Sequence, residues 1–177
     1  MALVAGIIFA FLTLVLRLEP HSPNFVPVAA LALWAGAYLP RKIGFVFPLA
    51  VMFVSDAFIG FYDWRLMIVV YASFAAIIAV GWWVGKDKSL GRIFLASLAG
   101  SVLFYLATNF GVWALSSWYP KTAGGLADAY LLAIPFFRNT LAGDLFFNGV
   151  FFGSYALALF LSRLKTPEIS YAGRPIR

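Results

Sequence analysis

Two aspartates inside otherwise apolar segments are the side chains of this chain best placed to do chemistry. Asp56 falls near the end of one apolar run, and Asp144 falls near the start of another. A carboxylate inside a membrane-spanning helix costs roughly 2.5–3.5 kcal/mol on insertion, and such groups normally face the interior of a bundle or a water-filled cavity. Thr140, Asp144 and Asn148 are spaced four residues apart, so they share one face of a helix. Together with Asn109, these residues predict a polar cluster in the outer half of a helical bundle.

Three interpretations of this cluster stay open on the sequence alone. The aspartates could neutralise Arg17, Arg65 or Arg138 in buried ion pairs that fix the register of the helices. They could line a binding pocket, because aromatic walls with a few placed polar groups are typical of sites for small molecules. They could also lie on a path for protons or ions. The residues predicted to bind a substrate are Asn24, Asp56, Trp64, Asn109, Trp113, Arg138, Asp144 and Asn148.

The sequence holds little that points to catalysis. Its one histidine, His21, has no second histidine at ligand spacing, and the chain has no cysteine. Neither a histidine-based metal site nor thiolate chemistry is therefore predicted. The chain also has no Gly-x-x-x-x-Gly-Lys loop that could hold the phosphates of ATP. We predict that the protein is not an enzyme and uses no metal and no cofactor.

Six apolar runs must position these side chains. They cover residues 2–18, 25–40, 43–61, 66–85, 91–118 and 139–163. The mean hydropathy is +0.92, and charged residues make up 11% of the chain, against roughly 25% in soluble domains. These values predict an all-α, polytopic membrane protein with six transmembrane helices. We expect the six helices to form a single domain over 1–165, followed by a cytoplasmic tail over 166–177.

The basic residues predict the orientation of the helices. Nine of the 13 Lys and Arg residues fall in alternate connections and the C-terminal tail, and four fall in the other connections. Because short loops rich in Lys and Arg stay in the cytoplasm, both termini are predicted to be cytoplasmic, in the inner (plasma) membrane of the cell. The net charge of +6 is spread over separate loops, so it favours membrane lipids as partners and argues against nucleic acid.

The second apolar run is expected to begin with irregular backbone. Pro20, Pro23 and Pro27 each lack a backbone donor and disfavour helix at the preceding residue. Such backbone is tolerated at membrane depth where protein or a water-filled cavity covers it. The segment therefore predicts either a cavity on the outer side or an interfacial loop. Residues 126–138 are too short to span the membrane and are predicted to form an interfacial helix or a lid.

Small residues recur at a spacing of four in several runs, a pattern that lets helices approach each other closely. Most of these stripes are expected to pack inside the bundle. The stripe of Ala2, Gly6 and Ala10 lies in an end helix, so it is the one predicted to dock a partner protein.

Several motifs resemble those of an uncharacterised family of bacterial integral membrane proteins. They are RLEPHSPNFVPVAA at 17–30, GAY at 36–38, Ser55-Asp56 with Gly60, TNFGVW at 108–113, and the stretch from Pro135-Phe136 to Gly143-Asp144. That family in turn resembles the membrane-embedded substrate-capture (S) components of energy-coupling-factor transporters. S components are six-helix proteins that bind vitamins or related small molecules near the outer surface of the membrane.

The resemblance implies a substrate-binding subunit for the uptake of a small organic solute, such as a vitamin or a related compound. It also implies a coupling membrane subunit with ATPases as partners, and a contact between that subunit and the small residues of the first helix. The alternative is a non-transporting structural subunit of a larger membrane complex. In that case internal ion pairs would close the polar cluster.

Overall fold

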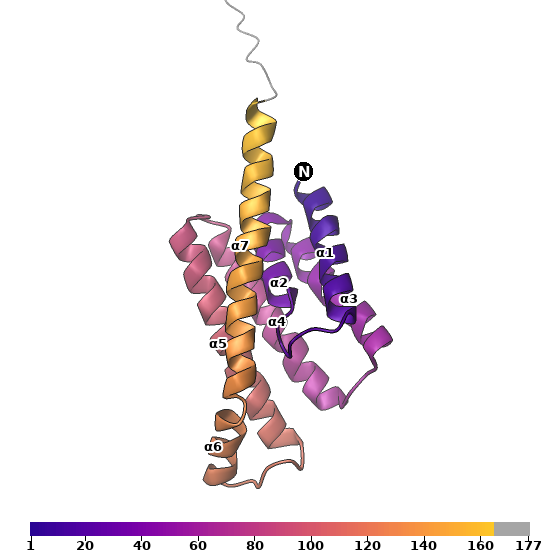
Figure 1. The fold of residues 1–177 in the computed structure, drawn as a ribbon, viewed down its shortest axis with the longest axis vertical. Helices are drawn as coiled ribbons and strands as arrows, with labels where there is room; N and C mark the ends of the chain where they lie inside the picture. The colour runs from indigo at the N-terminus through magenta and orange to yellow at the C-terminus, as the bar shows by residue number, and fades with distance from the viewer. Residues whose placement is uncertain (165–177) are drawn as a thin grey trace, which may run out of the picture.

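The computed structural model describes residues 1–164, which fold into helices and short connections (Figure 1). In this part of the chain there are seven helices: α1 (Ala2–Leu18), α2 (Val28–Tyr38), α3 (Arg41–Ile59), α4 (Trp64–Val84), α5 (Leu90–Leu115), α6 (Ala123–Leu131) and α7 (Ile134–Leu164). α3, α4, α5 and α7 are long and apolar enough to cross a membrane, and α1 and α2 are shorter apolar helices. The prediction of an all-α, multi-pass membrane protein is thereby confirmed. That α1 and α2 also span the membrane stays a prediction.

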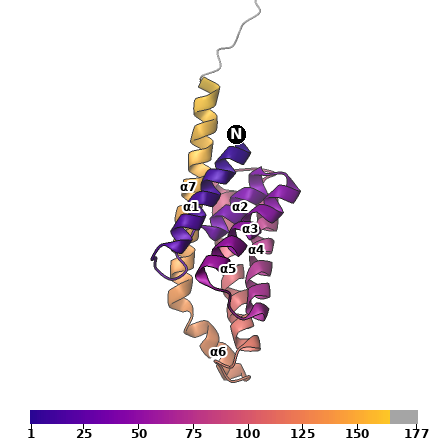
Figure 2. The same ribbon diagram turned by 90° about the vertical axis from the view of Figure 1, so that its right-hand side faces the viewer.

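α2 lies at the centre of the bundle (Figures 1 and 2). Ten of its 11 residues are buried, and α4, α3, α7, α1 and α5 all pack against it. Eleven residues that rise 1.5 Å each make a helix of roughly 16 Å, about half the hydrocarbon thickness of a bilayer. The chain that leads into it, residues 19–27, has no helical structure. The segment at the centre of the bundle, residues 19–38, is therefore helical over only part of the membrane thickness.

Glycines let α2 approach its neighbours until the backbones touch. A Cβ atom added at Gly36 would lie 2.3 Å from the carbonyl oxygen of Ile78 in α4, and one added at Gly81 would lie 2.4 Å from the carbonyl oxygen of Leu33. Both distances are far shorter than a van der Waals contact, so only glycine fits. α3 approaches α2 in the same way at Gly44. Such close packing stabilises helices in lipid, where no hydrophobic effect drives them together.

An aromatic cluster joins α1 and α7 to α2. Trp34 of α2 is fully buried. The ring of Phe9 lies edge-on to Trp34 with 5.0 Å between the centroids, and it stacks on Phe151 at 4.2 Å. Tyr155 packs edge-on against Trp34 at 5.2 Å. Aromatic pairs of this kind contribute about 0.5–1.5 kcal/mol each beyond the area that they bury.

The small-residue stripe of α1 faces this aromatic cluster. Gly6 and Ala10 are buried, and a Cβ atom added at Gly6 would lie 3.4 Å from the ring of Trp34. Ala2 is half-buried. In this fold the stripe serves internal packing, so a partner that met α1 would contact a different face. The large apolar side chains exposed on α1 include Leu3, Val4, Ile7, Ile8 and Phe11.

The two ends of the bundle differ in charge (Figures 1 and 2). The N-terminus, the end of α7 and the connections 39–40 and 85–89 lie at one end, and α6 with the connections 60–63 and 116–122 lies at the other. This is the alternation that the basic residues predict. The described basic residues at the first end are Arg41, Lys42, Lys86, Lys88, Arg92 and Arg163. Lys165, Arg174, Arg177 and the predicted tail over 166–177 lie outside the described residues.

Gly81→Ala is expected to destabilise the protein, because its methyl group would collide with the backbone of α2, which no change of rotamer can relieve. Overpacking of this kind typically costs about 1–3 kcal/mol, and occasionally more. Gly149→Ala is the control, since a Cβ atom there meets nothing within 4 Å and alanine is favoured over glycine in a helix. The measurement is the melting temperature of both variants in one detergent. Equal melting temperatures would contradict the close packing of α2 against α4.

The predicted orientation can be tested with single cysteines, because the chain has none of its own. A membrane-impermeant thiol reagent applied to intact cells is expected to label Ser117→Cys, between α5 and α6, and to spare Asp87→Cys, between α4 and α5. Both positions are exposed, so both should react once the cells are broken. Labelling of position 87 but not 117 in intact cells would reverse the orientation.

Candidate functional site

The proline-rich segment between α1 and α2 packs against α7. Asn24 has a left-handed φ of 62°, a conformation in which asparagine is enriched. The side-chain amide of Asn139 in α7 donates a hydrogen bond to the carbonyl oxygen of Pro23 at 3.0 Å. Pro27 then precedes α2 without a side-chain cap. This conformation places Asn24 in the wall of three neighbouring cavities.

The first of these, the aromatic cavity, has a volume of about 350 Å³ and lies between α5, the start of α7 and the connection 116–122. Its polar lining includes Thr108 and Asn109. Asn109 Nδ2 donates to the carbonyl oxygen of Tyr105 at 2.8 Å, and its side-chain oxygen accepts no hydrogen bond from residues 1–164. The aromatic residues that line this cavity are Phe104, Tyr105, Trp118, Tyr119, Phe136 and Phe137.

A smaller carboxylate cavity, of about 50 Å³, adjoins the aromatic cavity. Asn24, Phe104 and Thr140 line both. Asp144 also lines the carboxylate cavity, and Val28 brings the N-terminal end of α2 to it. The backbone N–H groups of a helix's first turn have no partners within the helix and carry partial positive charge. The carboxylate cavity is thus lined by both an acidic side chain and the positive end of a helix.

Asp144 has no cationic partner within the described residues. It is 3% exposed, its Oδ2 accepts a hydrogen bond from Ser101 Oγ at 2.6 Å, and its Oδ1 accepts none from residues 1–164. One turn further along α7, Asn148 Nδ2 donates to Ser97 Oγ at 2.9 Å. Asn148 Oδ1 is buried and has no hydrogen-bond partner in the same part of the chain. α5 and α7 therefore share a buried polar layer in which two oxygens, Asp144 Oδ1 and Asn148 Oδ1, receive no hydrogen bond from residues 1–164.

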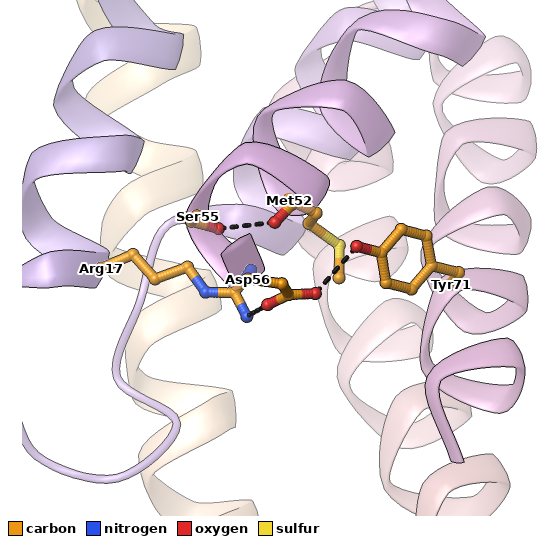
Figure 3. A network of polar contacts seen from close by, with 5 residues as sticks. All are labelled: Arg17, Met52, Ser55, Asp56 and Tyr71. Atoms are coloured by element: carbon orange, nitrogen blue, oxygen red, sulfur yellow. Dashed lines mark hydrogen bonds and ion pairs between the residues drawn. The ribbon is translucent and has the colours of Figure 1, made fainter. Parts of the chain in front are cut away.

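Asp56, in contrast, is closed by an ion pair (Figure 3). Arg17 Nη2 lies 2.6 Å from Asp56 Oδ1, and the hydroxyl of Tyr71 donates to Oδ2 at 2.8 Å. The carboxylate, in a residue that is 1% exposed, thus ties α1, α3 and α4 together. Burial and the negative charge of Asp56 raise the pKa of Tyr62, in the connection 60–63, to about 12. The phenol of Tyr62 therefore stays protonated at physiological pH.

The third cavity, the arginine cavity, has a volume of about 410 Å³ and lies beside this ion pair. Arg17 and His21 line it, and it shares Asn24, Phe74 and Phe104 with the carboxylate cavity. Arg17 Nη1 is buried and has no hydrogen-bond partner among residues 1–164. The carboxylate cavity thus lies between the two larger ones, and the three adjoin along the segment that holds Asn24.

The structure brings together three of the residues predicted to bind a substrate. Asn24, Asn109 and Asp144 line adjoining cavities. Asn148 lies one turn beyond Asp144 and bonds to α5. Asp56 takes part in an ion pair with Arg17, which is one of the interpretations that the sequence leaves open. The described residues gather no three His, Asp or Glu side chains into a candidate metal site.

Trp64, Trp113 and Arg138 lie apart from the three cavities. Trp64 is 64% exposed. Trp113 Nε1 donates to the carbonyl oxygen of Pro120 at 3.0 Å, so it fixes the connection 116–122. Arg138 is exposed and pairs with no carboxylate in the described part of the chain. The geometry gives these three side chains no contact with the cavities.

The sequence reasoning missed three hydroxyl groups of the site: Ser97, Ser101 and Tyr71. The two serines are spaced four residues apart, as Asp144 and Asn148 are, and this matching spacing in a second apolar run is the signal that could have found them. When two helices that carry such pairs face each other, each residue of one pair can contact one residue of the other. Tyr71 carries no comparable signal, because aromatic residues make up 19% of the chain.

Comparison with known proteins places the chain in a family. A family model described as "Family of unknown function (DUF6580)" matches residues 1–168. No curated protein and no solved structure matches the chain significantly. The match confirms the resemblance to an uncharacterised family over most of the chain. The further likeness to S components stays a prediction.

Asp56→Ala is expected to destabilise the protein strongly, because it leaves Arg17 partly buried without a counterion. Removal of one member of a buried pair costs about 3–5 kcal/mol. Asp87→Ala is the matched control, since Asp87 lies 3.5 Å from Arg92 in an exposed pair, and exposed pairs contribute at most about 1 kcal/mol. The measurement is thermal unfolding in detergent. If Asp56→Ala melts no lower than the control, the pair is not structural.

Proposed function

We propose that this chain, which belongs to the DUF6580 family of unknown function, is a membrane-embedded protein that captures a small organic solute for uptake. The observation that carries the proposal is the group of adjoining cavities around Asn24 and Phe104, next to the unpaired carboxylate of Asp144. A buried acidic group without a counterion is costly, and within membrane segments such groups mark sites of function. A purely structural role would account for the hydrogen bond from Ser101 to Asp144, but not for the cavity beside the carboxylate.

The cavities have the size and lining of a site for a small molecule. The aromatic and arginine cavities hold about 350 and 410 Å³, within the range of roughly 300–1,000 Å³ typical of ligand sites. Aromatic walls supply most of the contact area, and the free oxygen of Asn109 supplies a directed polar group. In the predicted orientation, the aromatic cavity lies toward the outer side of the membrane, where a solute for uptake would arrive.

The short central helix adds a second polar feature to the site. α2 is a half-length helix whose N-terminal residue, Val28, lines both the carboxylate and the arginine cavities. Half-helices that end near the middle of the membrane, with their N-termini directed at a substrate, are a recurrent device of transporters. This likeness in geometry supports solute capture, and it is independent of the resemblance to S components.

Uptake driven by ATP would require partners, because the chain has no phosphate-binding loop. The resemblance to S components points to a coupling membrane subunit with ATPases, and to a vitamin or a related compound as the solute. We place the protein in the inner (plasma) membrane of the cell on the same grounds. A coupling subunit that met α1 would contact its exposed apolar side chains, such as Ile7 and Phe11.

One observation favours the alternative, a structural subunit of a larger membrane complex. Asp56 is already neutralised by Arg17 and accepts a hydrogen bond from Tyr71, so its carboxylate needs no ligand. The alternative does not account for Asp144, whose charge has no partner in residues 1–164. The two functions differ in whether the protein retains a small molecule.

Native mass spectrometry of protein extracted in a mild detergent is expected to show a retained small molecule. Once it is identified, Asn109→Ala should weaken its binding by about 0.5–1.5 kcal/mol, or roughly two- to tenfold, because one neutral hydrogen bond is lost. Calorimetric titration measures the change. Ser154→Ala, in α7 and outside the three cavities, should leave the affinity unchanged. Two results together would favour the structural subunit: the purified protein holds no solute, and no extract of the native cells raises its melting temperature.

A further inference from the structure

We propose that the captured solute carries a protonated amine, which Asp144 binds in the carboxylate cavity, and an aromatic body, which occupies the aromatic cavity. This inference rests on the proposed function and names the class of its substrate. It follows from three properties of the site. Among the described residues Asp144 has no cationic partner, its Oδ1 receives no hydrogen bond, and the two cavities differ in size.

The first property is a buried carboxyl group with no cationic partner among the described residues. Asp144 is 3% exposed, and no Lys, Arg or His of the described residues forms an ion pair with it; the two ion pairs found there join Arg17 to Asp56 and Arg92 to Asp87. The N-terminal end of α2 supplies a partial positive charge of about half an elementary charge. This partial charge, on the wall of the same cavity as Asp144, does not replace a cationic partner.

The second property is a carboxylate oxygen that receives no hydrogen bond from the described residues. Ser101 donates to Asp144 Oδ2, and Asn148 donates to Ser97. Asp144 Oδ1 and Asn148 Oδ1 receive no hydrogen bond from residues 1–164. Asp144 lines the carboxylate cavity, so a guest that bonds to its Oδ1 must donate, and an ammonium group offers three N–H donors and a full positive charge. A carboxylate or phosphate on the guest would instead place a second acidic group beside Asp144.

The third property is the difference in size between the two cavities. The carboxylate cavity, of about 50 Å³, accommodates a group of a few heavy atoms, since a water molecule occupies roughly 30 Å³. It adjoins the aromatic cavity of about 350 Å³ through Asn24, Phe104 and Thr140. A cationic head group therefore fits beside Asp144, and a ring fits among the aromatic side chains. The face of Phe104, which lines both cavities, also attracts a cation.

Matched probes of one shape test this class of substrate. We would titrate the purified protein with phenethylamine, phenethyl alcohol and hydrocinnamate, which share a phenyl ring and differ in the charge of the head group. The amine is expected to bind at least about tenfold more tightly than the alcohol, and the carboxylate most weakly. Replacement of sodium chloride by potassium chloride tests whether a sodium ion, rather than an amine, neutralises Asp144.

Variants assign the preference to Asp144. Asp144→Asn should weaken the binding of phenethylamine by about ten- to a hundredfold, because a hydrogen bond to a charged group is lost, and should leave phenethyl alcohol within about twofold. Asp128→Asn, which changes an exposed carboxylate of α6, is the matched control and should alter neither. If Asp144→Asn does not fold, Asp144→Glu, which retains the charge, should keep the preference for the amine, and the wild-type comparison of the three probes still decides.

The outcomes separate this inference from the proposed function. Binding of the alcohol or the carboxylate as tightly as the amine would overturn the substrate class and leave solute capture intact. A retained native solute without an amine would do the same. Sodium-specific stabilisation that depends on Asp144, without any response to the amine, would assign the site to a metal ion and overturn the inference. Failure of all probes, in a protein that retains no solute, would overturn both proposals.

Discussion

The central helix α2 is the constraint on which the rest of the structure depends. It is buried on every side, and the close contact between Gly36 and Gly81 fixes its distance from α4. Because it is about half as long as a bilayer core is thick, irregular chain must lead into it. That chain is tolerated because α7 covers it, and because Asn139 satisfies the carbonyl oxygen of Pro23. The cavities beside it are therefore a consequence of the length of one helix.

The two buried aspartates show how their surroundings decide the role of identical side chains. Asp56 has a guanidinium group on one oxygen and a phenol on the other, so both oxygens are used by the protein itself. Asp144 has one hydroxyl donor, Ser101, and a cavity. Removal of an ion from water costs several kcal/mol even after relaxation. The fold compensates this cost internally at Asp56, whereas at Asp144 the described residues supply one hydroxyl donor and no cation.

Much of the architecture could be predicted because the bilayer acts locally on the sequence. Apolar runs, the alternation of basic residues and the penalty on buried charge are all visible in short windows, and they predicted the membrane helices and the burial of both aspartates. The choice of partner is not local. Three arginines were available to Asp56, and only the placement of α1 beside α3 selects Arg17. Likewise, the prolines predict irregular backbone, but the contact that holds it joins residues 116 positions apart. The stripe at Gly6 packs inward because Trp34 lies opposite.

The packing also distinguishes two parts of the chain: the tightly packed body of α2 and the segment before it, which borders the cavities. The backbone contacts at Gly36 and the aromatic cluster around Trp34 lie along the body of α2, whereas Asn24 lies in the segment before it. That segment forms a wall shared by all three cavities, and Asn139 and Phe147 of α7 hold it in place through a hydrogen bond to Pro23 and a ring contact with Phe25. The same segment continues from Arg17, whose ion pair with Asp56 holds the end of α1. A solute captured as we propose would contact this segment at Asn24, a few residues from Arg17. In the proposed function, α1, whose large apolar side chains are exposed, would be the element through which occupancy of the site reaches a partner in the membrane.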